Sequence, residues 1–291
     1  MRGSHFLVER PRRARQSIRR GWQTTGSRTE RARLATTLGY FHVLSAVNRV
    51  ATVEPPIKAM GLTLHFGSYD QFVHTFDEVF AKGSYAITLP NPRPTIVDCG
   101  ANLGLSVLYF KHRFPDATIV AFEPEEANYA LLNKNIIANA LTDLTCHRIA
   151  LGGEDGSAVF HTEPSKTGSV MGTVGAPSAR PHLTATQTVP VKRLSSYLET
   201  PVDLLKLDIE GSEGAVLSDL AKSGKLGFVN RMIVEYHHHL GVDQLSLAET
   251  LTLIEGAGFD FQIATPDHSI AVEQAYFEDV LIYAYRETSQ A

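Results

Sequence analysis

Charged residues interrupt an apolar segment in "DLLKLDIEGSE", residues 203–213. The first half of this segment has the composition of a buried strand, yet Lys206 lies in its middle, and Asp208 and Glu210 follow where the strand would end. Charges beside an apolar core are unfavourable to bury unless they are paired or used in chemistry. Because side chains alternate across a strand, Lys206 and Asp208 should point to the same side. We therefore expect Asp208 in a site, with Lys206 in a structural ion pair or holding a substrate hydroxyl.

A second group of candidate residues, a glutamate followed by histidines, lies at the end of the segment "VNRMIVEYHHHL". If the strand stays extended, Glu235 and His237 share one side of it with His239, whereas His238 faces away. One interpretation is a carboxylate that orients a histidine base. A second is metal ligation together with Asp208, and a third is an exposed turn without chemistry.

A glycine turn and a separate acid suggest a ligand site earlier in the chain. In "VDCGANLGLS", Asp98 supplies a carboxylate at a strand end, and Gly100 and Gly104 let the backbone approach a ligand closely. The G-x-G-x-x-G spacing is absent, and a tight strand–helix turn alone also explains the glycines. Glu123 in "AFEPEE" lies where an acid would accept hydrogen bonds from ribose hydroxyls. Together these features predict a nucleoside-bearing cofactor, either NAD or S-adenosylmethionine.

The elements that must position these residues alternate between strands and helices. The predicted strands cover residues 95–100, 118–124, 144–151, 202–209, 229–236, 259–266 and 279–285, and the predicted helices cover 105–114, 128–139, 212–223 and 246–257. Such alternation predicts an α/β fold with a mainly parallel sheet and helices on both faces. The last two strands lack a helix between them, so we expect an antiparallel pair there. In such sheets ligands bind beyond the carboxyl ends of the strands, where the candidate residues lie.

Two further regions carry weaker signals. Helical spacing of apolar residues from Leu34 to Val53 and in residues 68–83 predicts N-terminal helices before the sheet. The stretch from Gly152 to Pro190 is rich in Gly, Ser, Thr and Pro and includes Lys166. We expect it to contact a polyhydroxylated acceptor, with an uninvolved insertion as the alternative.

Composition and charge divide the chain into three parts. With 291 residues, 43% of them hydrophobic, the chain suits one globular domain at residues 91–291, preceded by a helical segment at 34–90 and a basic arm at 1–33. The arm carries ten Arg against two acids, a net charge of +8 in a chain of total charge −4. It is either a solvated tail or a contact for an acidic membrane surface. The sequence contains no apolar run long enough for a transmembrane helix and only two cysteines, so we expect a cytoplasmic protein without disulfides.

Four motifs in this order carry a family resemblance: "VDCGANLGLSVLYF", "VAFEPEEANYALLNKNI", "VKRLSSYL" and "LLKLDIEGSEGAVL". The chain resembles the FkbM family of methyltransferases from about Phe80 to Tyr283. The resemblance implies the class I methyltransferase fold, which is Rossmann-like, and S-adenosylmethionine as the methyl donor. It also implies O-methylation of hydroxyls on sugars, glycolipids or natural products.

The resemblance also assigns roles to residues. It implies that Asp98, Gly100, Asn102 and Gly104 form the turn around the amino-acid end of the cofactor, and that Glu123 accepts from the ribose hydroxyls.

For the remaining candidates the roles are less constrained. Tyr85 either closes over the cofactor or packs in the core. The family pattern of an acid followed by a histidine favours Glu235 and His237 as the orienting acid and the base. Glu210 either binds substrate, as we also expect for Lys166, or caps the next helix.

We therefore expect an S-adenosylmethionine-dependent O-methyltransferase that acts on a small-molecule or glycan acceptor and not on nucleic acid. We expect no metal requirement. An NAD-dependent oxidoreductase and a non-catalytic cofactor-binding subunit are the alternatives.

Overall fold

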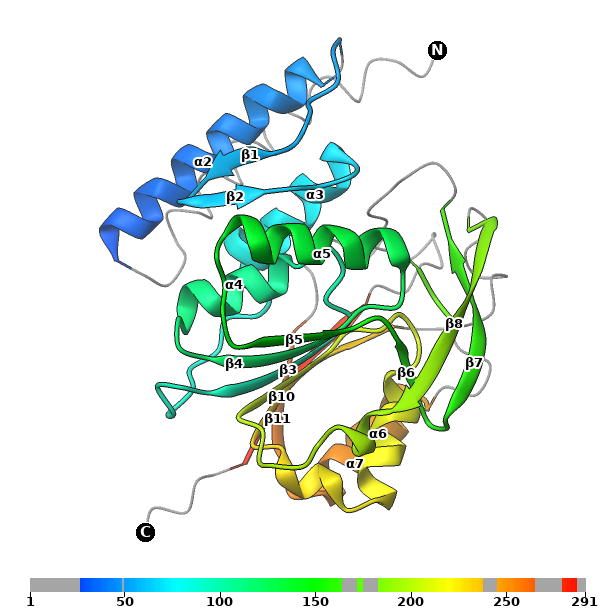
Figure 1. Cartoon of the computed structure of the whole chain (residues 1–291). Coiled ribbons are helices and arrows are strands. Elements are labelled where there is room, and N and C mark those ends of the chain that lie inside the picture. Colours follow the sequence, from blue (N-terminus) through cyan, green and yellow to red (C-terminus); the bar gives the residue numbers. More distant parts are fainter. Residues whose placement is uncertain are drawn as a thin grey trace, which may run out of the picture.

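A seven-stranded sheet forms the centre of the molecule (Figure 1). The computed structural model describes residues 27–48, 50–163, 172–174, 183–237, 245–264 and 279–286. The strands of the central sheet are β3 (Thr95–Cys99), β4 (Thr118–Phe122), β5 (Leu144–His147), β9 (Leu204–Leu207), β10 (Arg231–Tyr236), β11 (Asp260–Ala264) and β12 (Val280–Tyr285). Their order is β11-β12-β10-β9-β3-β4-β5.

Most neighbouring strands of this sheet run parallel, and only β12 is antiparallel to both of its neighbours. The predicted mainly parallel sheet with an antiparallel C-terminal pair is confirmed, and with it the Rossmann-like fold class. The chain between β11 and β12 lies outside the described residues.

Helices cover both faces of the sheet (Figure 1). They are α4 (Leu105–Arg113) and α5 (Glu126–Ala138) on one face, and α6 (Glu213–Lys222) and α7 (Leu247–Gly256) on the other. Successive residues of a strand serve opposite faces: Ile96 packs in the α4–α5 core, and Val97 packs in the α6–α7 core. Because both faces are covered, the central strands are mostly apolar, and all four residues of β9 are buried, Lys206 included.

The N-terminal segment packs outside α4 and α5. It consists of α2 (Arg28–Val47), the strands β1 (Ile57–Ala59) and β2 (Leu62–Leu64), α3 (Tyr69–Phe76) and the π-helix η1 (Asp77–Lys82). Helix α2 begins with a reciprocal capping box between Ser27 and Glu30. The basic arm was predicted to end at residue 33, and this boundary is wrong because residues 28–33 belong to α2. The predicted helix end at Val53 is also wrong, since α2 ends at Val47; the rest of the arm, residues 1–26, lies outside the described residues.

Asn135 of α5 and Asn139, the C-cap residue of that helix, attach this segment to the sheet domain. Asn135 accepts from the backbone N–H of His65 at 2.7 Å and donates to the His65 carbonyl at 3.0 Å. Asn139 makes the same pair of bonds with Thr63, at 2.8 Å each. A primary amide can donate and accept at once, so each asparagine satisfies both backbone groups of one residue at the edge of the β1–β2 hairpin. This hairpin was not predicted because three-residue strands are too short to show a period of two.

A second, three-stranded sheet lies beside the central one (Figure 1). Its strands are β6 (Ala150–Gly152), β7 (Gly156–Thr162) and β8 (Ala185–Arg193), in the order β6-β8-β7. The sequence analysis assigned no strand to residues 152–190, where β7 and most of β8 lie. Both strands expose many of their polar residues and bury few apolar ones, so the apolar signal of a strand is weak in the sequence. Lys166 lies outside the described residues.

Within the described part of the chain, none of the helices combines the length and apolar character needed to cross a membrane.

Candidate active site

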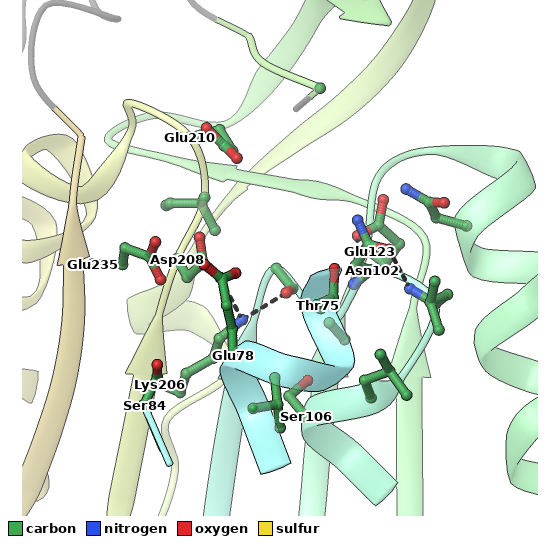
Figure 2. Close-up of a pocket in the computed structure, with 18 of the residues that line it drawn as sticks. Thr75, Glu78, Ser84, Asn102, Ser106, Glu123, Lys206, Asp208, Glu210 and Glu235 are labelled. Carbon is green, nitrogen blue, oxygen red and sulfur yellow. Dashed lines mark hydrogen bonds and ion pairs between the residues drawn. The ribbon is translucent and has the colours of Figure 1, made fainter. Parts of the chain in front are cut away.

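A cavity of about 840 Å³ opens where β3, β4, β9 and β10 end (Figure 2). Nine of the predicted site residues line it: Tyr85, Gly100, Asn102, Glu123, Lys206, Asp208, Glu210, Glu235 and His237. Asp98 and Gly104 lie behind the wall and are not among the described lining residues. The tertiary structure thus brings the candidates from four strand ends together, as expected for parallel strands whose carboxyl ends meet at one edge.

Lys206 lies buried between two carboxylates, with 1% of its surface exposed. Its Nζ is 3.2 Å from Asp98 Oδ1 and 3.2 Å from Asp208 Oδ2, and it donates to the Gly100 carbonyl at 2.6 Å. The strand register explains this contact, because Lys206 of β9 lies directly beside Asp98 of β3. Asp208 follows on the same side of the chain, two residues later. This geometry favours the structural ion pair over a lysine that holds substrate.

Lys206 and Asp208 each favour the charged form of the other. Burial alone would lower the pKa of Lys206, but Asp208 and Asp98 outweigh burial and raise it. Burial alone would raise the pKa of Asp208, but Lys206 and His237 outweigh burial and lower it. Tyr85 donates to Asp208 Oδ2 at 2.9 Å, and burial raises the pKa of its phenol, so the phenol stays a donor. Lys206 and Tyr85 therefore hold Asp208 Oδ2 in place, and Asp208 Oδ1 lies on the side of His237.

The turn after β3 requires its glycines for packing. Gly100 and Gly104 have φ angles of 85° and 92°, in the left-handed region. A Cβ at Gly100 would collide with the backbone oxygen of Asp208, and one at Gly104 would lie 2.7 Å from Leu132 Cδ1. The sequence suggested that both glycines admit a ligand. The structure shows that Gly100 lets the turn approach the backbone of Asp208 and that Gly104 lets it approach Leu132 of α5. Of the two glycines, Gly100 lines the cavity and Gly104 does not.

Glu123 is held at the end of β4 by two backbone donors. The N–H of Asn102 donates to its Oε2 at 2.8 Å, and the N–H of Glu125 donates to its Oε1 at 2.8 Å. Burial raises the pKa of Glu123 to about 8 despite these bonds. A ligand that donates hydroxyl groups to this carboxylate would favour its charged form, which is the role expected from the sequence.

His237 faces the cavity with one nitrogen and the protein with the other. Its Nε2 lies 3.3 Å from Glu210 Oε2 and 3.8 Å from Asp208 Oδ1, and its Nδ1 lies 2.8 Å from Glu213 Oε1. Burial alone would lower the pKa of His237, but Glu210 and Glu213 outweigh burial and raise it well above the ordinary value.

Glu235 does not hold the ring nitrogen of His237 as the sequence suggested. The carboxyl group that contacts Nδ1 is Glu213, the first residue of α6. Burial, followed by the charge of Asp208, raises the pKa of Glu235 well above its ordinary value. Glu235 instead lies on the cavity wall beside Asp208 (Figure 2).

Several polar residues of the N-terminal segment that line the cavity were not selected from the sequence, among them Thr75 of α3 and Glu78 of η1. Both lie on the side facing Asp208 (Figure 2). The helical spacing of apolar residues was the available signal, because it buries Phe72 and Phe76 and leaves polar residues such as Thr75 between them.

The described residues include one trio close enough to hold a metal ion. Asp208, Glu235 and His237 each offer one ligand atom, and these atoms lie within 4.8 Å of one another. Asp208 already pairs with Lys206, and His237 with Glu210, so these charges have partners within the protein. The expectation of no metal requirement stays a prediction.

The comparison with known families decides the identity of this fold and site. The model of the FkbM methyltransferase domain matches residues 98–261, which is more than half of the chain. The chain belongs to the FkbM methyltransferase family. The matched region runs from Asp98 through His237 into β11, and it excludes the N-terminal wall of the cavity that contains Thr75 and Glu78.

Two fungal proteins are similar to this FkbM methyltransferase. Methyltransferase 1 of Beauveria bassiana (strain ARSEF 2860) is 30% identical over 218 residues, which cover 68% of this chain and 84% of the relative. Methyltransferase sdnD of Sordaria araneosa is 29% identical over 219 residues, which cover 65% of this chain and 82% of the relative.

Among solved structures, the FkbM methyltransferase of Methylobacillus flagellatus KT aligns with a TM-score of 0.47 and 16% identity. The alignment covers 94% of this chain and 59% of that one.

The cofactor of this fold and family is S-adenosylmethionine, and the chemistry of the cavity fits it. Glu123 offers a carboxylate to ribose hydroxyls, and the neighbouring Ile149 and Leu151 offer an apolar surface to a base. The carboxylates of the Asp208 side suit a ligand with a sulfonium and an ammonium group.

Replacing Glu123 with Ala should weaken S-adenosylmethionine binding by about 1.5–3 kcal/mol, because charge-assisted hydrogen bonds to the ribose would be lost. Calorimetry on the folded variant measures this, and Glu126→Ala is the matched control, since Glu126 is an exposed acid that pairs with Arg148. Equal affinities of the two variants would remove Glu123 from the cofactor site.

Lys206→Met should lower the free energy of unfolding by about 3–5 kcal/mol, because the buried carboxylate of Asp98 and the partly buried carboxylate of Asp208 would lose their cation. Lys192→Met is the control: Lys192 pairs with Asp155 on the surface, where a pair contributes about 0–1 kcal/mol. Denaturant unfolding compares the two. A Lys206→Met protein of normal stability but without turnover would instead assign the lysine to substrate.

Turnover is expected to survive dialysis against a strong chelator, because Asp208 already pairs with Lys206 and His237 with Glu210. Assays before and after dialysis, with and without added magnesium or manganese, test this. Activity that is lost on dialysis and restored by either ion would identify Asp208, Glu235 and His237 as a metal site.

Proposed function

We propose that this chain transfers the methyl group of S-adenosylmethionine to a hydroxyl group of a small-molecule or glycan acceptor. One observation carries the proposal: Asp208, Glu235 and His237 converge on the same cavity as Glu123 and the turn after β3. A cofactor site and a set of proton-handling groups therefore share one space.

The chemistry requires a group that takes the acceptor proton. When bound, S-adenosylmethionine supplies a methyl group that is electrophilic. An alcohol is a weak nucleophile at neutral pH, so a positioned base that removes its proton contributes typically ~10²–10⁴-fold. His237 Nε2 faces the cavity and is the proposed proton acceptor. The carboxylates near Nε2 stabilise the imidazolium that forms when it takes the proton.

The neighbouring acids would orient the acceptor. Asp208 Oδ2 is held by Lys206 and Tyr85, which fixes the carboxylate and presents Oδ1 toward His237. Burial raises the pKa of Glu235, which favours the protonated carboxyl group, the form that can donate a hydrogen bond to an acceptor oxygen. Fixed groups of this kind contribute by holding the reacting atoms in line.

The opposite side of the cavity is the proposed acceptor wall. Thr75 and Glu78 face the Asp208 side and offer a hydroxyl and a carboxylate to a polyhydroxylated molecule (Figure 2). A wall rich in carboxylates repels phosphate groups, which supports a small-molecule or glycan acceptor over nucleic acid. The membership in a methyltransferase family argues against the oxidoreductase alternative.

His237→Ala should lower turnover by ~10²-fold or more and leave S-adenosylmethionine affinity nearly unchanged. The measurement is transfer of labelled methyl groups to glycan, lipid and small-molecule extracts, together with calorimetry of cofactor binding. His147→Ala is the control, because His147 lies at the end of β5 and outside the described cavity wall. Only deprotonated His237 can act as a base and its pKa is raised, so wild-type turnover should increase with pH through a midpoint above about 6.5. Normal turnover in the His237 variant would refute the proposed base.

A further inference from the structure

Glu213 is a fully buried acid that lies behind the cavity, with 0% of its surface exposed. It is the first residue of α6, and it accepts from the backbone N–H groups of Ile209 and Gly211 at 3.1 Å each. Its Oε1 also lies 2.8 Å from His237 Nδ1, at the end of a different strand. One carboxyl group therefore joins the β9–α6 turn to the proposed base.

The turn fixes the direction of this contact. Two backbone donors point at the Glu213 carboxyl group, so it serves as an acceptor and leaves the donor role to His237 Nδ1. A neutral imidazole carries one N–H group, and a carboxylate on Nδ1 keeps the proton there. The lone pair of Nε2 then faces the cavity, where Asp208 and Glu210 lie.

Capping alone does not explain the placement of Glu213. A negative charge near the first turn of a helix is stabilising by itself. Glu249 near the start of α7 has that role: it accepts from Ser246 N–H at 2.8 Å, and the contact is exposed. Glu213 is buried and reaches across to β10 instead, and burial of a charge is favourable only when its partners satisfy it.

We propose that Glu213 is the positioning residue of the proposed base: it fixes the tautomer and the ring orientation of His237 so that Nε2 accepts the proton of the acceptor hydroxyl. The inference rests on the proposed function and adds a residue that does not touch the cavity.

The acidic residues around His237 determine how its pKa, and with it the pH dependence of kcat/KM, should respond to a substitution of Glu213. Asp208 and Glu210 lie in the turn after β9, Glu213 in α6 and Glu235 in β10, and a negative charge on any of these side chains favours the imidazolium. Loss of the Glu213 charge therefore lowers the pKa of His237. The acid limb of kcat/KM should move to lower pH while the maximal rate falls, because the ring is no longer held in one tautomer.

The decisive variant is Glu213→Gln, which keeps the side-chain volume and one acceptor oxygen for the turn. Methyl transfer at saturating S-adenosylmethionine should fall at least 10-fold, the acid limb should shift to lower pH, and cofactor affinity should stay within about twofold. Glu249→Gln is the matched control, because it alters a glutamate that accepts a backbone N–H at a helix start, and its pH profile should equal that of the wild type.

A second measurement does not depend on turnover. Nitrogen-15 NMR of histidine-labelled wild-type protein should show the proton of neutral His237 on Nδ1, and the Glu213→Gln protein should show a mixture of tautomers. A wild-type ring protonated on Nε2 overturns the inference, and so does a folded Glu213→Gln protein with unchanged rate and pH profile. If the wild type binds S-adenosylmethionine but transfers no methyl group to any acceptor, the proposed function fails, while the NMR result still decides whether Glu213 sets the tautomer.

Discussion

The site depends on one buried cation. Lys206 lies between Asp98 and Asp208 with almost no exposure, and its ammonium also donates to the carbonyl of Gly100. Without it, the buried carboxylate of Asp98 and the partly buried carboxylate of Asp208 would face each other without a cation, which is strongly unfavourable. The ion pairs and the hydrogen bond of Lys206 connect the end of β9 to β3 and to the turn after β3. The strand ends that form the cavity therefore keep a fixed distance from one another.

That constraint explains why so many acids can face one cavity. Asp208 uses one oxygen for Lys206 and Tyr85 and turns the other toward His237. His237 in turn lies between Glu213 on the protein side and Glu210 on the cavity side. Lys206, Asp208 and His237 each have neighbours of opposite charge, and these contacts connect the core to the cavity wall. Rigid, satisfied groups of this kind lose little entropy when a substrate binds.

The family region builds only part of the cavity. The segment from α3 to η1 lies before the matched residues, yet Thr75 and Glu78 face the Asp208 side. Asn135 of α5 and its C-cap residue Asn139 hold the β1–β2 hairpin against the sheet domain, and the cluster of Phe41, Phe72 and Phe76 joins α2 to α3. A cofactor site set by the family and an acceptor wall supplied by an added segment would allow one chemistry to serve different acceptors.

The sequence by itself determined the alternation of strands and helices, the parallel sheet and the strand ends at which Glu123, Asp208 and His237 lie, because period and spacing are local properties of the chain. Tertiary structure decided the partners. Asp98 was expected beside the cofactor but lies beneath the cavity, since the register of β3 and β9 sets it against Lys206. The partner of His237 Nδ1 is Glu213 and not Glu235. Glu235 and His237 are two residues apart on the same side of the chain, so their side chains are separated along it. The start of α6 instead places Glu213 against the imidazole ring of His237. Such contacts depend on how elements pack, which no local pattern encodes.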